Sequence, residues 1–282
     1  MNKYPDKFLG CISDYNDARI VVFGAPFDST TSFRSGTRLA SRYMRTESIY
    51  GMETYSPYQD KDLEELNIHD WGDLELAFGN SERAVADIEK LVSEIIYDHK
   101  IPLMIGGEHL LTLGCVKAAH KAYDNLKVLQ FDAHLDVRDE ILGERLSHGT
   151  VMRRINELLD DKKIYQFCVR SGLREEFNWA EEHNNVVRYN LDGLENALNE
   201  IGNDPVYLTF DLDALDPSIM PGTGTPEAGG VNFNEIMRAI SLIGKANIIG
   251  ADIVELAPSL DLSGASTVLA CKLLRELLIS IY

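Results

Sequence analysis

The sequence predicts an α/β fold: a three-layer α/β/α sandwich around a doubly wound, mainly parallel sheet of about eight strands. Two observations lead to this prediction. Short apolar, β-branched runs alternate with longer stretches of helical periodicity along the whole chain, as they do in successive βαβ units. Several of the short runs are apolar throughout, which is typical of strands that helices cover on both faces.

Seven runs have the length and composition of clear strands, and one more is weaker. The clear strands are expected at residues 20–23, 102–105, 127–131, 163–169, 186–189, 206–210 and 247–254, and the weaker one at 68–74. In a doubly wound sheet the ligand site lies beyond the carboxyl ends of the strands. The residues that follow these runs are therefore the first place to look for function.

Helical periodicity fills the segments between the strands. Helices are expected at residues 81–99, 111–123, 148–159, 174–183, 234–243 and 263–281. The first of them shows the pattern best, because Val85, Ile88 and Val92 recur on one face and Asn80 or Ser81 is available as an N-cap.

Composition favours one folded unit and excludes some partners. The 282 residues are 45% hydrophobic and 26% charged, and no linker, repeat or low-complexity stretch divides them, so a single domain over 1–282 is expected. The formal net charge of −18 would repel nucleic acids and anionic membrane surfaces and attract small cationic molecules.

The cysteines and the start of the chain suggest a cytoplasmic protein. Cys11, Cys115, Cys168 and Cys271 form no Cys-x-x-Cys pair, so they are interpreted as core thiols rather than metal or redox motifs. Residues 1–10 are polar, and no window approaches eighteen uninterrupted apolar residues, so neither export nor a membrane span is expected.

Acidic and histidine residues follow two of the predicted strands at short spacing. Asp132, His134 and Asp136 come directly after the run 127–131, and Asp211 and Asp213 follow the run 206–210. In extended backbone, alternate side chains point the same way, so each set would converge on one small volume. A lone Asp-x-Asp more often caps a loop, but these two sets together with a third strand exit favour a metal site.

A third strand exit adds a further imidazole. The run 102–105 leads into Gly106 and Gly107, whose freedom to turn would deliver His109 to the same edge. Four carboxylates and two imidazoles cannot share one site without cations. Oxygen and imidazole ligands without thiolate indicate manganese, magnesium or iron, and six ligands suit two metals about 3.5–4 Å apart. The remaining imidazoles outside these motifs are interpreted as structural: His69, His99, His120 and His183.

The motifs together resemble the signature set of the ureohydrolase family, which contains the arginases and agmatinases, and they are more similar to the agmatinase branch. The segments that carry the resemblance cover nearly the whole chain in order: Gly106-Gly107-Glu108-His109, Phe131-Asp132-Ala133-His134-Leu135-Asp136, Ser147-His148-Gly149-Thr150, Asp211-Leu212-Asp213-Ala214-Leu215-Asp216-Pro217, Pro221-Gly222-Thr223-Gly224-Thr225-Pro226 and Asp252-Ile253-Val254-Glu255.

The resemblance implies an arginase/deacetylase-like fold, two Mn²⁺ ions per subunit, a homotrimer or homohexamer, and hydrolysis of agmatine to putrescine and urea in polyamine biosynthesis. It also implies two overlapping ligand sets. The first metal would take His109, Asp132, Asp136 and Asp211, and the second Asp132, His134, Asp211 and Asp213, with Asp132 and Asp211 bridging.

Three further residues match the family's substrate-handling positions. His148 corresponds to a proton-shuttle histidine, Glu255 to the acid that binds the guanidinium, and Thr225 to a wall of the substrate pocket; Asp136, as a ligand, also counts among the catalytic residues. These roles make chemical sense. A carboxylate can pair with a planar guanidinium, and an imidazole can move a proton near neutral pH.

The sequence departs from the family pattern in two places. Arg34-Ser35-Gly36-Thr37-Arg38 lacks the usual Gly-Pro segment after it, which concerns loop or subunit packing away from the ligands. The loop 137–147 lacks the Asn and Ser that receive a carboxylate in arginases, which disfavours arginine.

The same loop leaves the substrate tail open. Its acidic residues Asp139, Glu140 and Glu144 could receive the ammonium of agmatine, although they could equally be a solvated acidic surface. Arg138 would suit a carboxylate tail such as that of guanidinobutyrate.

Other functions are also compatible with parts of the pattern. The alternatives within enzymes are a ureohydrolase for guanidinobutyrate, arginine or formimidoylglutamate, and a deacetylase-like enzyme that needs only one metal. From another class comes a non-catalytic binding module of the same fold. The native metal could also be iron, nickel or cobalt.

Overall fold

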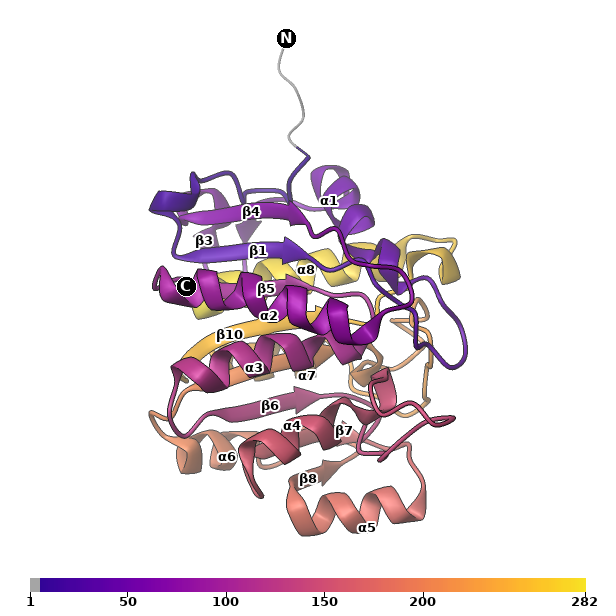
Figure 1. Ribbon diagram of the computed structural model, residues 1–282. Helices are drawn as coiled ribbons and strands as arrows, with labels where there is room; N and C mark the ends of the chain where they lie inside the picture. Colours follow the sequence, from indigo (N-terminus) through magenta and orange to yellow (C-terminus); the bar gives the residue numbers. More distant parts are fainter. Residues whose placement is uncertain (1–5) are drawn as a thin grey trace.

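A computed structural model describes residues 6–282 and contains the expected central sheet (Figure 1). Eight strands lie in the order β4-β1-β5-β10-β9-β6-β7-β8, and every neighbouring pair is parallel. Their bounds are β1 Ile20–Gly24, β4 Ile68–Asp73, β5 Ile101–Ile105, β6 Lys127–Phe131, β7 Ile164–Val169, β8 Asn185–Arg188, β9 Val206–Asp211 and β10 Ile248–Val254. The first five residues of the polar start lie outside the described residues.

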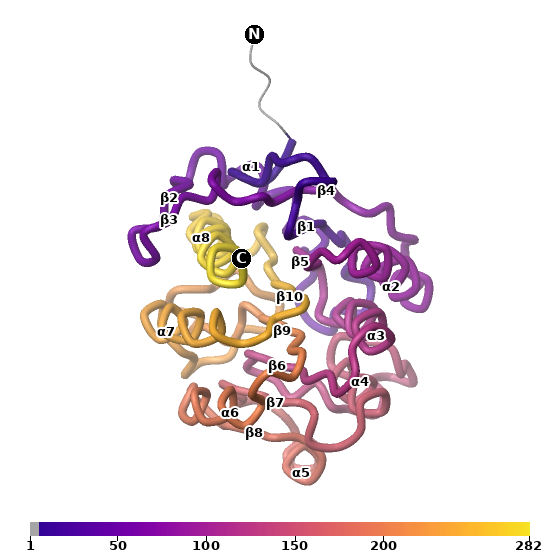
Figure 2. The backbone as a smooth tube through the Cα atoms, turned by 90° about the vertical axis from the view of Figure 1, so that its left-hand side faces the viewer, coloured from indigo at the N-terminus to yellow at the C-terminus, as the bar shows by residue number. Residues whose placement is uncertain are grey.

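Helices cover both faces of the sheet (Figure 2). One face carries α2 Ser81–Tyr97, α3 Thr112–Ala122, α4 Val151–Leu159 and α5 Arg174–His183, and the other α1 Ala40–Gly51, α6 Leu194–Ile201, α7 Phe233–Ile243 and α8 Ala265–Ile281. Two separate apolar cores result, one on each face, which explains why the central strands are apolar on both sides. The structure confirms the predicted three-layer α/β/α fold.

The strand order brings the functional segments together. The four central strands are β5, β10, β9 and β6, and because all are parallel, their carboxyl ends meet at one edge of the sheet. The segments that follow β5, β6 and β9 are the ones that carry the predicted ligands. Glu255 directly follows β10 and so joins them.

Two helices and a small hairpin go beyond the sequence prediction. The hairpin pairs β2 Tyr55–Ser56 with β3 Lys61–Asp62. Helix α1 gives little apolar signal, because its buried face includes Ser41, Arg45 and Ser48 beside Ala40 and Met44. Helix α6 is short and begins after a glycine, so it offers too little periodicity for a prediction.

Within residues 6–282, no helix combines the length and the apolar character that crossing a membrane requires. The four cysteines are buried free thiols. One of them, Cys271 in α8, donates a hydrogen bond to the carbonyl of Met44 at 3.3 Å and so ties α8 to α1.

A buried ion pair attaches α1 to the edge of the sheet. Arg45 donates from Nε to Oδ2 of Asp70 at 2.8 Å and from Nη2 to Oδ1 at 2.9 Å, and it also contacts Asp73. Oδ2 of Asp70 accepts a further bond from the backbone N–H of Phe8 at 2.7 Å. Arg45 and Asp70 are both nearly fully buried, so neither charge has water as an alternative partner.

We therefore predict that Arg45→Met lowers the free energy of unfolding by about 3 kcal/mol, because Asp70 is left as an uncompensated buried charge. The double variant Arg45→Met/Asp70→Asn removes that charge and should regain part of the loss. Urea unfolding followed by circular dichroism measures both variants. Equal destabilisation of the single and double variants would contradict the ion-pair argument.

Candidate active site

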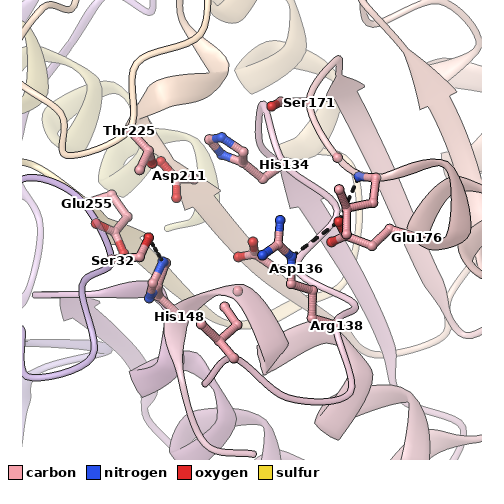
Figure 3. A pocket seen from close by; sticks show the side chains of 14 residues that line it. Ser32, His134, Asp136, Arg138, His148, Ser171, Glu176, Asp211, Thr225 and Glu255 are labelled. Atoms are coloured by element: carbon pink, nitrogen blue, oxygen red, sulfur yellow. Dashed lines mark hydrogen bonds and ion pairs between the residues drawn. The ribbon is translucent and has the colours of Figure 1, made fainter. Parts of the chain in front are cut away.

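A cavity of about 340 Å³ opens at the carboxyl edge of the central strands. Figure 3 shows the side chains that line it, which come from segments far apart in the sequence. The predicted residues His134, Asp136, His148, Asp211 and Glu255 are among them. Thr225 also lines this cavity.

His109 lies at the centre of three of the predicted ligands. Its Nδ1 lies 3.1 Å from Oδ2 of Asp132, 3.2 Å from Oδ2 of Asp136 and 3.2 Å from Oδ2 of Asp211. All four side chains are buried. One possible cation position is therefore surrounded by one imidazole and three carboxylates.

A second group of ligand atoms adjoins the first. Nδ1 of His134 lies 3.0 Å from Oδ2 of Asp213 and 3.4 Å from Oδ1 of Asp132. The structure thus gives two triads: His109, Asp132 and Asp211, and Asp132, His134 and Asp213. Within each triad the candidate ligand atoms lie within 4.8 Å of one another, and Asp132 belongs to both. All six predicted ligands are brought together in the arrangement that two neighbouring cations would need.

The backbone reaches this arrangement differently from the sequence expectation. The chain after β6 does not stay extended, because Asp136 has a left-handed backbone with φ of 54°. Neither glycine after β5 is left-handed. Gly107 is required for space, since a Cβ there would lie 1.9 Å from the carbonyl oxygen of Phe27. Close approach of backbones, rather than a sharp turn, positions His109.

The donor atoms fit divalent cations. Nδ1 of His109 is buried and has no hydrogen-bond partner among residues 6–282, although three carboxylate oxygens lie within 3.2 Å of it. A buried nitrogen left unpaired among oxygens is an expensive arrangement unless a cation fills the space between them. Oxygen and imidazole donors without thiolate suit manganese, magnesium or iron.

The electrostatics of the cluster point the same way. Burial raises the pKa of Asp211 well above its usual range, and the charges of Asp213 and Asp132 raise it further. Burial also raises the pKa of Asp136 to about 6. Burial opposes protonation of His109, but the carboxylates around it outweigh that effect and raise its pKa. The cluster holds protons where a cation would supply the missing positive charge.

A hydroxyl beneath the cluster fixes which nitrogen of His109 is free. Nε2 of His109 lies 2.9 Å from Oγ1 of Thr209, and that hydroxyl donates to Oδ1 of Asp252 at 2.6 Å. Because the hydroxyl proton is used on Asp252, Thr209 accepts the Nε2 proton of His109. With Nε2 donating to Thr209, Nδ1 is the nitrogen left to bind a cation between the carboxylates.

Glu255 stands at the cavity wall with a fixed orientation. Its Oε1 accepts a hydrogen bond from the backbone N–H of His109 at 2.6 Å, and its backbone is left-handed with φ of 66°. Burial raises its pKa to about 8. No hydrogen bond from residues 6–282 is directed at Oε2, so this oxygen is available to a cationic ligand.

His148 is held by the loop that follows β1. Nε2 of His148 lies 3.0 Å from Oγ of Ser32, as Figure 3 shows, and its backbone N–H donates to Oγ1 of Thr30 at 3.0 Å. Thr30 is in turn anchored on the buried Glu108 through its N–H at 2.8 Å and its hydroxyl at 2.5 Å. Burial lowers the pKa of His148 to about 4, so the ring is neutral at pH 7.

Thr225 lines the cavity from a loop that Arg34 holds in place. Its hydroxyl donates to Oδ2 of Asp213 at 3.4 Å. Arg34 donates to the carbonyls of Thr223 at 2.7 Å and Gly224 at 3.3 Å. The segment that departs from the family pattern was expected away from the ligands, but it holds the loop that carries Thr225.

The loop 137–147 contributes Arg138 to the cavity. Nε of Arg138 lies 3.3 Å from Oε2 of Glu176, which is nearly fully buried and also accepts from the N–H of Leu173 at 2.7 Å. Asp139 instead pairs with Arg154 at 2.7 Å. The exposed Glu140 and Glu144 are not among the residues that line the cavity.

Sequence reasoning missed several residues of the site. Glu176, Thr30, Ser32 and Glu108 were not predicted to take part. Glu108 stands beside a predicted ligand, and the short polar residues after the first strand follow a strand exit, so these positions carried a weak signal. Glu176 lies inside a predicted helix, where an acidic residue is normally a solvated surface residue.

Comparisons with known proteins identify the family. A model of the arginase family matches residues 18–280. The chain is 41% identical to an agmatinase of Bacillus cereus, over 96% of this chain and 95% of that protein. It is 37% identical to a guanidinobutyrase of Pseudomonas aeruginosa, over 94% of this chain and 86% of that protein.

A solved structure agrees with this relationship. The crystal structure of an agmatine ureohydrolase of Thermoplasma volcanium superposes with a TM-score of 0.90 at 32% identity, covering 98% of this chain and 94% of that one. The part of the chain that the family model matches includes all eight strands of the sheet and every residue that lines the cavity. The chain belongs to the arginase family and, within it, to the agmatinase branch of the ureohydrolase enzymes.

Proposed function

We propose that the protein hydrolyses agmatine to putrescine and urea with two Mn²⁺ ions per subunit, as a step of polyamine biosynthesis. The observation that carries the proposal is the convergence of six ligand-type side chains beside one cavity, whose wall includes the buried carboxylate of Glu255 with Oε2 unbonded among residues 6–282. Two overlapping ligand triads favour this function over a deacetylase-like enzyme with one metal.

Glu255 binds the guanidinium of the substrate in this proposal. A planar guanidinium pairs with a carboxylate through two parallel hydrogen bonds, and burial strengthens such a pair. The bond from the N–H of His109 holds the carboxylate still, so the carbon to be attacked is held beside the ligand cluster. Two bound divalent cations would lower the pKa of a coordinated water to about 7 and so supply hydroxide there.

His148 moves the proton that the reaction must transfer. Attack by hydroxide on the guanidinium carbon breaks a C–N bond, and the departing amine has to gain a proton. The neutral ring of His148 accepts at Nε2 the proton that the added hydroxyl group loses as the urea carbonyl forms, and it passes this proton to the departing amine. Ser32, 3.0 Å from Nε2, and the anchored Thr30 keep the ring in place for the transfer.

The far side of the cavity decides the substrate tail. In Figure 3, Glu255 and His148 lie on one side and Glu176 on the other. Glu176 is a buried carboxylate that accepts a hydrogen bond from Arg138. An ammonium tail that took the place of Arg138 would form a charge-assisted hydrogen bond with the same carboxylate. A carboxylate tail would instead need Arg138. We assign the tail ammonium of agmatine to Glu176, in place of the acidic residues 139, 140 and 144.

Two further parts of the proposal rest on the sequence and its resemblance alone. They are assembly into a homotrimer or homohexamer, and a cytoplasmic location. A size determination in solution tests the first, because monomeric protein would contradict it.

The metal content gives a first prediction. Protein stripped with a chelator should lose activity, regain it with Mn²⁺, and bind two equivalents per subunit, because the site has two triads. Asp213→Ala should reduce the count to one, since Asp213 belongs to one triad only. Elemental analysis after dialysis measures the counts, and a single equivalent in the unmodified protein would favour the one-metal alternative.

The proton-transfer step gives a second prediction. His148→Asn should lower kcat for agmatine by about 10²- to 10⁴-fold because no group remains to move the proton. The Mn²⁺ content should stay at two, since His148 is not among the proposed ligands. Steady-state kinetics with and without added imidazole measure the effect, and partial rescue by imidazole is expected. An unchanged kcat would rule out the assigned role.

The cavity gives a third prediction, on substrate choice. Urea release should be fastest with agmatine, compared with guanidinobutyrate, arginine and formimidoylglutamate. Glu176→Gln should raise KM for agmatine by about 10-fold or more, because the side of the cavity opposite Glu255 loses its negative charge. Arg138→Met should weaken guanidinobutyrate turnover only. Arg145→Met, an exposed arginine of the same loop that pairs with Glu157, is the matched control.

One result of these assays would contradict agmatine as the substrate. Preference for a carboxylate-tailed compound, lost in Arg138→Met, would keep the ureohydrolase chemistry and overturn agmatine as the substrate. The 37% identical guanidinobutyrase makes that comparison essential.

A further inference from the structure

A row of buried polar side chains crosses the sheet one layer below the proposed ligands. Asp252, Thr209, Gln130 and Gln166 are direct neighbours on β10, β9, β6 and β7, and all four are fully buried. Gln130 and Thr209 stand two residues before Asp132 and Asp211, so each faces the same side of the sheet as its ligand. Polar side chains are costly at such positions, where most strand residues are apolar.

The amide half of this row forms a continuous chain that ends on a ligand. Gln130 donates from Nε2 to Oδ2 of Asp132 at 2.6 Å, and Gln166 donates to Oε1 of Gln130 at 2.6 Å. Asn184 donates to Oε1 of Gln166 at 2.9 Å, and Asn156 to Oδ1 of Asn184 at 3.2 Å. The chain runs from α4, on one face of the sheet, to the carboxylate shared by both triads.

The direction of every amide in the chain follows from its end. The carboxylate of Asp132 can only accept, so Gln130 must turn its NH₂ group toward it and its carbonyl toward Gln166. Gln166 must then donate, and its NH₂ group also reaches the carbonyl of Leu135 at 2.8 Å, another group that can only accept. Asn184 is fixed in the same way. Aligned amide dipoles of this kind strengthen one another.

We propose that Gln130, Gln166 and Asn184 are positioning residues for Asp132 and set its affinity for the metals. The inference rests on the proposed two-metal function and deepens it. Gln130 holds Oδ2 of Asp132 while the backbone N–H of His134 holds Oδ1 at 2.5 Å, so together they fix the rotation of the carboxylate. Gln166 also holds the loop at Leu135. Groups that orient a metal ligand in this way change metal affinity by about 10- to 100-fold when they are lost.

The experiment compares two replacements of Gln166. Gln166→Met removes the donors with little change of volume. Gln166→Glu replaces them with a group that accepts when ionised, so Gln130 must reverse its amide and turn its carbonyl toward Asp132. Gln59→Met is the matched control, because the amide of Gln59 is bonded to Glu276 on the opposite face of the sheet.

The readout is Mn²⁺ affinity, measured by competition with a chelating dye, with the Mn²⁺ EPR spectrum as a second measure. Affinity should fall about 10-fold in Gln166→Met and about a further 10-fold in Gln166→Glu, and stay unchanged in Gln59→Met. Circular dichroism of the metal-free proteins checks folding. If the Gln166 variants do not fold, Asn184→Leu and Asn184→Asp pose the same comparison one amide further from the metals.

The failures of the two proposals can be told apart. Unmodified protein that binds no Mn²⁺ contradicts the proposed function. Unmodified protein that binds Mn²⁺, together with folded Gln166 or Asn184 pairs of unchanged affinity, overturns only the positioning role.

Discussion

The repulsion between four carboxylates at the carboxyl edge of the sheet is the constraint on which the rest of the structure depends. Asp132, Asp136, Asp211 and Asp213 share one small volume with two imidazoles, and burial together with the neighbouring carboxylates raises the pKa of Asp136 and of Asp211. The parallel order of the central strands forces this convergence, and cations would relieve it. The parallel sheet is the support that holds these carboxylates close together against their mutual repulsion.

The strands and the convergence of acidic and histidine side chains could be predicted from the sequence because both follow simple rules. Fully apolar runs give buried parallel strands, and ligand-type residues after three such strands together favoured a metal site. The sequence did not reveal α1, because Arg45 is buried by an ion pair with Asp70 that lies far from it in the sequence. Glu176 escaped for a similar reason, since only the tertiary fold turns this helical acid toward the cavity.

The polar side chains beneath the carboxylate cluster could not be predicted from the sequence. Thr209 and Gln130 look like ordinary strand residues, yet one fixes the tautomer of His109 and the other donates to Asp132. Their partners, Asp252 and Gln166, lie on neighbouring strands, so the connection exists only once the strand order is known. Strand order was not deducible from periodicity, which gives elements but not their neighbours.

The left-handed backbones of Asp136 and Glu255 carry an evolutionary consequence. A residue with a side chain at φ of 54° or 66° is strained by about 1–2 kcal/mol, and glycine would relieve that strain. At both positions glycine would also remove a buried carboxylate. Selection for thermal stability alone would therefore erase these two residues, so their retention in a lineage would report continuing selection for their proposed role in catalysis. Their joint loss would mark descendants that keep the fold as a scaffold.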